Sequence, residues 1–219
     1  MYESRGVPMM GLNKRIIILA AALVLVGCAS KPSVTEYQCR AGDWQSIGFR
    51  DGANGVANTH ILAHQEACGE FGIFPERDGY LAGWREGLNN YCTAQNGYQL
   101  GIRGSGMNTV CPETLQSAFA AAYADGRQIY QAQREVNRLA SQIQQDEQRL
   151  VQIKEELVGT TTAQLVPDLT VEERVNLVAK FESLLDERAS INTRLPELEY
   201  ALDTAELRLA ELHQTLAYR

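Results

Sequence analysis

The chain has 219 residues, with 20 basic and 27 acidic side chains and a formal net charge of −7 at neutral pH. An acidic chain has no positive field to neutralise phosphates, which argues against nucleic acid as a partner and against electrostatic attachment to anionic lipids. The sequence also lacks a Gly-x-Ser-x-Gly nucleophile elbow and a phosphate-binding loop followed by lysine, so we expect neither an enzyme nor a cofactor.

The first 27 residues combine a cationic patch with a short apolar run. Lys14-Arg15 precedes an unbroken apolar stretch over residues 16–26. A bilayer-spanning helix needs about 20 residues, so this stretch is short for a membrane anchor and typical of a secretory signal. It ends in Leu25-Val26-Gly27-Cys28, which is the bacterial lipobox pattern of an apolar residue, a spacer, a small residue and cysteine. We predict a lipoprotein signal peptide over 1–27 and lipidation of Cys28; an uncleaved membrane anchor is the alternative.

Lipid on Cys28 would tether the mature chain to a membrane. Several acyl chains, at about 0.8 kcal/mol per buried CH₂, make such attachment effectively permanent. Ala29 and Ser30 follow the cysteine. By resemblance to sorting rules of gamma-proteobacteria, the lack of Asp at the second position implies the outer membrane, facing the periplasm. Residues 28–36 are small and polar and are expected to form a flexible tether. Cleavage would remove three basic residues and one acidic residue, leaving 17 and 26 and a formal charge of −9.

Four cysteines follow the lipobox, and they are Cys39, Cys68, Cys92 and Cys111. An even number of cysteines within one stretch of an exported chain indicates two disulfides, and spacing alone allows three pairings. A four-thiolate zinc site is the alternative, but it needs closely spaced cysteine pairs and a reducing compartment.

Capping residues and glycines predict an all-α module over residues 37–130. Its helices are expected to begin at Trp44 after the cap Asp43, at Asn58 or Thr59, and at Pro75-Glu76, with the second and third ending near Gly69 and Cys92. Because antiparallel neighbours bring the start of one helix beside the end of the next, we predict the disulfides Cys39–Cys68 and Cys92–Cys111. Each would stabilise the module by roughly 2–4 kcal/mol.

A weak internal repeat runs through this module. Residues 48–52, 83–87 and 122–126 share the order small, aromatic, any residue, acidic, glycine. A glycine inside a helix costs about 1 kcal/mol relative to alanine, a cost that close packing of helix backbones along a smooth face can offset. The alternative is that some of these glycines end helices or open turns.

Beyond Pro112 glycine nearly disappears and apolar residues recur at alternating steps of three and four, as in a coiled-coil seam. We predict a first coiled-coil helix over 112–158, a hairpin loop over 159–170 and a second helix over 171–219, which starts with a Thr170/Glu173 capping box. Two helices of similar length should fold back as an antiparallel hairpin on the order of 60–70 Å long. Parallel association with another chain is the alternative.

Polar residues interrupt both seams of the expected hairpin. Asp146 lies in the first seam and Arg188 in the second, and folding about the loop would bring them within a few turns of each other. An ion pair between them is therefore an open expectation. Pro196 should kink the second helix because it removes one backbone hydrogen bond.

Two clusters in the module invite a chemical interpretation. His60, His64 and Cys68 are spaced four residues apart, which places them on one face of a helix as in a transition-metal site. A disulfide would remove the thiolate and leave too few ligands, so we predict no metal here. Asp51, Glu86 and Asp125 each precede a glycine in the repeat and could converge for acid–base work or calcium binding. Pairing with neighbouring arginines, or exposure to water, is the more ordinary role for such acids.

The glycine-rich segment 97–106 is expected to be a structured crossover. Tyr98 and Arg103 within it could contact a glycan.

The pattern of cysteines, glycines and aromatics in the module resembles the Domain of Unknown Function 2799 family over roughly residues 37–130. The residues that carry the resemblance are Asp43-Trp44, Gly48, Asp51-Gly52, Gly55, Ala67-Cys68, Gly72-Ile73, Tyr80, Gly83, Gly87-Leu88, Tyr91-Cys92, Asn96-Gly97, Gly101, Gly104, Cys111-Pro112, Phe119, Tyr123 and Gly126-Arg127. Met107 stands where an aromatic residue is expected. The family consists of proteobacterial lipoproteins without an assigned activity, so the resemblance implies a place in the envelope and no mechanism.

Taken together, these patterns favour a lipid-anchored envelope protein that presents a coiled-coil hairpin to a periplasmic protein partner. A module that binds glycan or peptidoglycan through Tyr98 and Arg103 is the alternative, and a metal-binding or enzymatic protein comes third.

Overall fold

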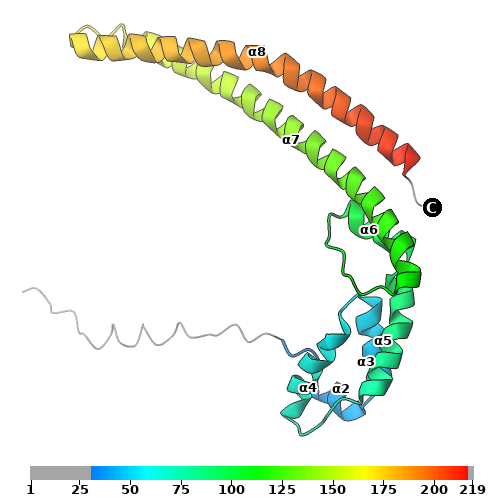
Figure 1. Cartoon of the computed structure of the whole chain (residues 1–219). Helices are drawn as coiled ribbons and strands as arrows, with labels where there is room; N and C mark the ends of the chain where they lie inside the picture. Colours follow the sequence, from blue (N-terminus) through cyan, green and yellow to red (C-terminus); the bar gives the residue numbers. More distant parts are fainter. Residues whose placement is uncertain (1–30, 217–219) are drawn as a thin grey trace, which may run out of the picture. The chain divides into compact units, whose positions relative to one another are not determined.

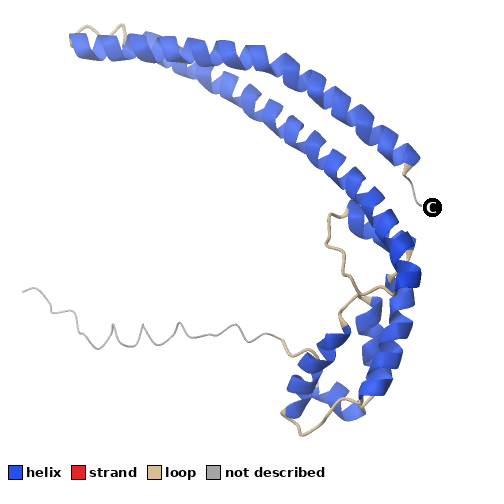
Figure 2. Cartoon of the chain, in the orientation of Figure 1, coloured by secondary structure: helices blue, strands red, loops and turns tan. Residues whose placement is uncertain are grey.

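The computed structural model describes residues 31–216, and this part of the chain is built from helices without strands (Figures 1 and 2). It divides into two compact units. The first contains residues 31–42 and 61–75, and the second contains residues 43–60 and 76–216. Cys28 and the predicted signal peptide lie outside the described residues. Within residues 31–216, no helix combines the length and apolar character that crossing a membrane would require.

The first unit consists of α2 (Glu36–Ala41) and α4 (Ile61–Gly69), joined by the Cys39–Cys68 disulfide. Both cysteines are fully buried, so the disulfide itself forms the centre of this small unit. A capping box at Thr35 begins α2, which had no clear signal in the sequence. Val34 is buried as well. The segment expected as a flexible tether over 28–36 is therefore part of the folded unit from about residue 33 onward.

The second unit contains three packed helix pairs. These are α3 (Trp44–Ala53) with α5 (Arg77–Tyr91), α6 (Ala94–Ile102) with α7 (Glu113–Ala163), and α7 with α8 (Val171–Thr215). A single 3₁₀ turn, η1 (Asn58–His60), follows α3. Capping side chains begin these helices where the sequence suggested: Asp43 accepts a hydrogen bond from the Ser46 amide, and Thr170 forms the capping box with Glu173.

Helix α6 corrects the interpretation of residues 97–106 as a crossover. Thr93 caps a helix that runs from Ala94 to Ile102, and only the residues after it are irregular. Gly97 and Gly101 lower the helix propensity of this segment and hid it from the sequence analysis. The Cys92–Cys111 disulfide, with a Cα–Cα distance of 5.6 Å, joins the end of α5 to the start of α7. Helix α6 and the loop after it lie between the two bridged cysteines.

Helices α7 and α8 form an antiparallel hairpin within one chain, so their seam does not need a parallel partner chain. The predicted seam residues are buried or half-buried along nearly the whole length, with Ile153, Leu184 and Ile191 at its centre. Helix α7 continues five residues beyond the boundary expected at 158. There Thr160 and Thr161 donate side-chain hydrogen bonds to the carbonyls four residues earlier, which keeps their hydroxyl groups satisfied in the helix.

Candidate functional site

The first helix pair is held together by glycines on both helices. Gly48 and Gly52 of α3 face α5, and Gly83 and Gly87 of α5 face α3. A methyl group added at any of these positions would overlap a backbone oxygen of the opposite helix. The two backbones are thus in direct contact, and any side chain larger than hydrogen would separate them.

The second helix pair repeats this arrangement. Gly97 and Gly101 of α6 pack on α7, and Gly126 of α7 packs on α6. Equivalent residues of the two pairs are separated by a constant number of positions. A residue of α6 lies 49 positions after its equivalent in α3, and a residue of α7 lies 39 positions after its equivalent in α5. Ala122 takes the place that Gly83 has in the first pair.

The turns after α3 and α6 are also equivalent. Gly55 and Gly104 both have a left-handed conformation, with φ of 68° and 69°. The Trp84 indole donates a hydrogen bond of 2.7 Å to the carbonyl just after Gly55. The Tyr123 hydroxyl donates one of 2.9 Å to the carbonyl just after Gly104. The module is therefore a twofold repeat of one glycine-packed helix pair.

This finding corrects the threefold repeat expected from the sequence. Residues 83–87 and 122–126 are equivalent, as expected. Residues 48–52 instead lie on the opposite helix of the first pair, and their counterpart is 97–101 on α6. The acidic position of the pattern is therefore not a shared feature of three equivalent sites.

The three acids of that pattern occupy different surroundings. Asp51 is buried and accepts a hydrogen bond of 2.9 Å from the Tyr80 hydroxyl. Burial, followed by the bond to Asp51, raises the pKa of Tyr80 well above its ordinary value, so the phenol keeps its proton. Glu86 is exposed on α5 and Asp125 is half-buried on α7. Asp51 thus belongs to a buried structural pair, and Glu86 and Asp125 are carboxylates in different surroundings.

The residues of the expected glycan site have different exposures. Tyr98 is only 6% exposed and packs with Ala122 and Ile129. Burial, followed by the charge of Asp125, raises the pKa of Tyr98. Arg103 is exposed at the end of α6. Because its ring is in the core, Tyr98 does not offer a stacking surface to a sugar.

The three residues whose spacing was weighed as a metal site, His60, His64 and Cys68, are divided between the two units. Cys68 is bound to Cys39, so its sulfur is not available as a thiolate. His64 is buried in α4, and its Nδ1 lies 2.8 Å from the Ser33 hydroxyl oxygen. His60 is half-buried at the end of η1 in the other unit. The disulfide thus removes the third ligand that the helical spacing suggested.

A comparison with known protein families gives a match within the module. Residues 43–128 match the model of a family described as Protein of unknown function (DUF2799). Over these residues, which are less than half of the chain, the protein is similar to this family. The match begins at the cap of α3 and ends within α7, so it covers both glycine-packed helix pairs. Neither curated proteins nor solved structures give a significant match to the chain.

The DUF2799 module continues into the hairpin without a break. Helix α7 belongs to the module at its start and to the hairpin over the rest of its 51 residues. Near the end of α8, Leu209, Leu212 and Leu216 pack against the core of the second helix pair. Both helices of the hairpin are therefore fixed to the DUF2799 module, α7 by continuity and α8 by packing.

The hairpin is loosely packed next to the DUF2799 module. A groove of about 560 Å³ lies between α7 and α8, and its lining includes Ala132, Leu139, Ala201 and Ala205. Alanine side chains at these positions are too short to fill the space between the helices. Close to the loop, by contrast, leucine and isoleucine fill the seam.

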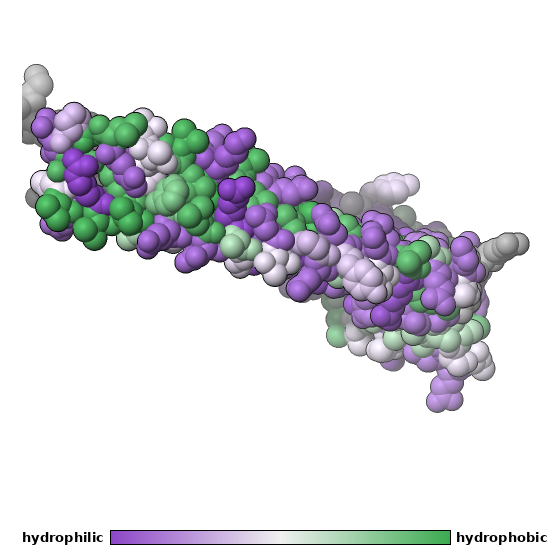
Figure 3. All heavy atoms as spheres, turned by 90° about the horizontal axis from the view of Figure 1, so that it is seen from above, coloured by the Kyte–Doolittle hydropathy of each residue, from purple (hydrophilic) through white to green (hydrophobic). Residues whose placement is uncertain are grey.

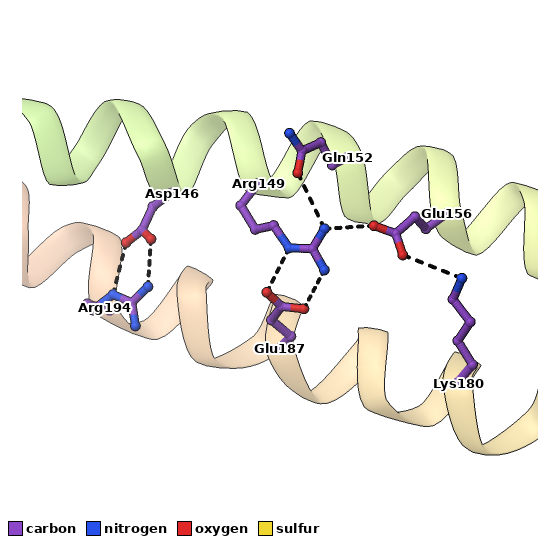
Figure 4. A network of polar contacts seen from close by, with 7 residues as sticks. All are labelled: Asp146, Arg149, Gln152, Glu156, Lys180, Glu187 and Arg194. Atoms are coloured by element: carbon purple, nitrogen blue, oxygen red, sulfur yellow. Dashed lines mark hydrogen bonds and ion pairs between the residues drawn. The ribbon is translucent and has the colours of Figure 1, made fainter. Parts of the chain in front are cut away.

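An ion-pair network crosses one side of the hairpin (Figure 4). Arg149 of α7 donates two hydrogen bonds, of 2.7 and 2.8 Å, to the carboxylate of Glu187 on α8. It donates a third, of 2.7 Å, to Glu156, which also faces Lys180 at 3.7 Å. Hydrogen bonds from Arg149 lower the pKa values of Glu187 and Glu156. This network fixes the register of α7 against α8 on this side.

The seam acid Asp146 pairs with a different arginine from the one expected. Arg194 donates two hydrogen bonds, of 2.9 and 2.6 Å, to Asp146 and lowers the pKa of its carboxyl group. Arg188 is exposed. Arg194 lies nearly two turns farther along α8 than Arg188, so a pairing based on seam positions alone chose the wrong arginine.

The opposite side of the hairpin carries a second apolar stripe. In an antiparallel helix pair, the residues just beside the seam on one side of α7 face the residues just beside it on the same side of α8 (the first flank). The residues beside the seam on the other side of each helix (the second flank) meet on the opposite surface of the hairpin. The ion-pairing residues Arg149, Glu156, Lys180 and Glu187 occupy the first flank. Large aliphatic residues occupy the second flank near the loop: Val151 (60% exposed), Val158 (63%), Leu165 (78%), Val171 (80%), Val175 (60%), Val178 (48%) and Leu185 (40%).

We call these seven residues the valine face. Figure 3 shows hydrophobic side chains gathered over the end of the hairpin that carries the loop. Within α8 the members follow the same steps of three and four as the seam, displaced by one residue, with Glu182 as the single polar member of the stripe. The sequence therefore contained the signal for this surface, but the apolar periodicity of the seam beside it is stronger.

Proposed function

We propose that this protein is a lipid-anchored envelope protein, held at the outer membrane facing the periplasm, that acts by binding another protein through the valine face of its hairpin. The exposure of the valine face carries the proposal. Soluble proteins rarely leave apolar patches of several hundred Å² open to water, and such patches mark interaction surfaces. A surface with aliphatic residues at coiled-coil spacing suits packing against helices.

The anchor in this proposal is supported by the lipobox that ends in Cys28 and by the two disulfides. Disulfides persist in oxidising compartments such as the periplasm. Cys39–Cys68 and Cys92–Cys111 use all four cysteines that follow the lipobox, which suits a chain exported before it folds. Lipidation of Cys28 would tether the DUF2799 module to the membrane surface.

A non-enzymatic role is consistent with the character of the module. Asp51 is engaged with Tyr80, Tyr98 lies in the core, and Cys68 is oxidised. These three candidate residues thus take part in holding the fold. We propose that the two glycine-packed helix pairs of the DUF2799 module serve as the base of the hairpin.

The anchor can be tested by metabolic labelling. Cells of a native host that express the full chain are grown with an alkyne analogue of palmitate, and the protein is isolated and probed for the label. We expect a labelled wild-type protein in the outer-membrane fraction and an unlabelled Cys28→Ser variant. An unlabelled wild-type protein with an intact amino terminus would refute the lipoprotein assignment.

The partner surface can be tested by photo-crosslinking in living cells. A photoreactive amino acid replaces Val175 in the full chain, and Leu207, which is 73% exposed on the same helix outside the valine face, serves as the matched control. We expect a protein adduct at position 175 and none at 207. Equal adducts at both positions, or none at either, would refute binding through this face.

A further inference from the structure

We propose that the occupant of the valine face is the valine face of a second copy of this chain. In this arrangement two hairpins pack antiparallel to each other about a twofold axis near Val178 and form a four-helix bundle. The inference rests on the proposed function, because it names the partner of the same surface. Two helices present the face side by side, and a four-helix bundle needs two more helices of the same kind to cover it.

The size of the valine face suits such a dimer. Burying one Val or Leu side chain corresponds to roughly 100 Å² of apolar surface, so seven members at their observed exposures present on the order of 400–500 Å². Apolar atoms make up about two thirds of the core of homodimer interfaces. With its polar border, the face therefore supplies about 600–750 Å² per copy, which is within the range that each partner contributes to an interface of standard size.

Six of the seven members of the valine face, all but Val175, are arranged symmetrically about one level of the hairpin. The ion pairs Arg149–Glu187 and Glu156–Lys180 fix which residues of α7 and α8 lie level with each other. The same register, extended by two residues along each helix, places Val158 level with Val178. On α7 and the turn after it, Val151 and Leu165 flank Val158 at equal spacing, and on α8 Val171 and Leu185 flank Val178 at equal spacing. A twofold axis at this level would superimpose the face on itself.

Two charged residues, Glu182 within the stripe and Arg174 beside it, follow the same symmetry. A shallow groove of about 310 Å³ on α8 is lined by Arg174, Val175, Val178, Ala179 and Glu182. Arg174 and Glu182 lie four residues before and after Val178 and carry opposite charges. When two α8 helices cross antiparallel at Val178, Arg174 of each copy lies opposite Glu182 of the other. The surface is thus complementary to itself in charge as well as in apolar area.

A membrane surface fits the valine face less well. Asp168, Glu172 and Glu173 lie around the hairpin loop next to the face. These carboxylates would be repelled by anionic lipid headgroups, and basic residues do not outnumber them at this end of the hairpin. A second hairpin, in contrast, offers both aliphatic side chains and arginine.

Cysteine crosslinking tests the twofold axis directly. Val178→Cys is introduced into the full chain, and the membranes of the expressing cells are oxidised mildly and run on a non-reducing gel. The added thiol is the reactive one, because the other four cysteines after the lipobox are paired. We expect most of the variant to run as a covalent dimer, while the matched Leu207→Cys variant remains a monomer. A monomer at both positions, or equal dimer at both, would overturn the proposal.

Charge reversal provides the second measurement. In the Val178→Cys background, Arg174→Glu places like charges opposite each other and should lower the dimer yield roughly two- to fivefold. Adding Glu182→Arg restores opposite charges and should restore the yield. If the double reversal does not recover the dimer, the antiparallel register is wrong.

The photo-crosslinking experiment separates this proposal from the proposed function. An adduct at position 175 with twice the mass of the chain supports the second copy. An adduct to a different protein keeps the valine face as a binding surface and overturns its self-association. The absence of any adduct overturns both.

Discussion

The two glycine-packed helix pairs of the DUF2799 module have the same backbone contacts but differ in one buried pair of side chains. Tyr80 of the first pair corresponds to Phe119 of the second, and Asp51 corresponds to Leu100. The first pair therefore buries a phenol bonded to a carboxylate, and the second buries a phenyl ring near an aliphatic side chain.

This difference shows that the glycine contacts and the central side chains play separate roles. Three of the four contact glycines recur in the second copy because the backbones touch there and a methyl group would overlap the opposite helix; Ala122 replaces the fourth. The central pair has changed at both positions together. A tyrosine without its acceptor would leave a buried hydroxyl unsatisfied, and an aspartate without its donor would leave a buried charge. The shared scaffold thus accommodates either a polar or an apolar central pair.

The largest effect is expected from breaking the backbone contact itself. In Gly87→Leu the new side chain would meet the Phe49 carbonyl and the Ala53 amide of α3. The helices must separate, and we expect the full chain to lose about 4 kcal/mol or more of unfolding free energy in urea titrations. Gly159→Leu, in open space on α7, is the matched control and should be neutral or stabilising. A variant at position 87 as stable as this control would disprove the close contact.

A smaller effect is expected from removing the polar pair of the first copy. Asp51→Leu leaves the Tyr80 hydroxyl without this acceptor and should cost about 2–3 kcal/mol of unfolding free energy. Adding Tyr80→Phe converts the pair to the composition of the second copy and should recover at least half of the loss. A double-mutant cycle measures this coupling. If the two losses simply add, the equivalence of the two pairs is wrong at this position.

A third variant addresses the one contact position that differs between the copies. Gly83→Ala gives the first pair the residue that Ala122 provides in the second. Because a methyl group at position 83 would overlap the Gln45 carbonyl, we expect a loss of about 1–3 kcal/mol. Ala122→Gly should also lower stability, by about 1 kcal/mol, because it adds flexibility to α7 without relieving any overlap. A stabilising Gly83→Ala would mean that the two pairs pack at the same distance.

The smallest effect is expected from acid, and it should separate the hairpin from the helix pairs. Arginine partners lower the pKa values of Asp146, Glu156 and Glu187 in the folded hairpin. Their ion pairs therefore contribute fully above the ordinary carboxyl pKa, near 4, and are lost as the pH falls below it. We expect faster amide hydrogen exchange, after correction for the intrinsic rates, in residues 146–194 at pH 3 than at pH 6. Amides of α6 should be affected less, and an equal response in both regions would contradict this assignment.

The sequence was sufficient for features that depend on local patterns. Heptad spacing predicted the hairpin, and the caps at Asp43 and Thr170 predicted where two helices begin. The disulfides Cys39–Cys68 and Cys92–Cys111 join the pairs of cysteines that the expected helices brought together. These predictions succeeded because periodicity and capping act within a few residues of the chain.

The sequence was insufficient where a tertiary contact overrides local preference. Gly97 and Gly101 disfavour a helix locally, and α6 exists because those glycines let it pack on α7. The same contact buries Tyr98, which the sequence suggested as a candidate contact for a glycan. The pairing of Asp146 with Arg194 also depends on the exact register of two long helices, which seam positions alone leave open by about two turns.

The unbroken course of α7 from the module into the hairpin makes this helix a molecular ruler. Its 51 residues extend about 75 Å at 1.5 Å per residue, and the residue count alone sets how far the valine face stands from the two glycine-packed pairs. Removing seven residues from each hairpin helix would shorten the reach by about 10 Å and keep the face pointing in nearly the same direction. Removing four or five would instead turn the face around the axis, so this protein encodes distance and direction in the same stretch of chain.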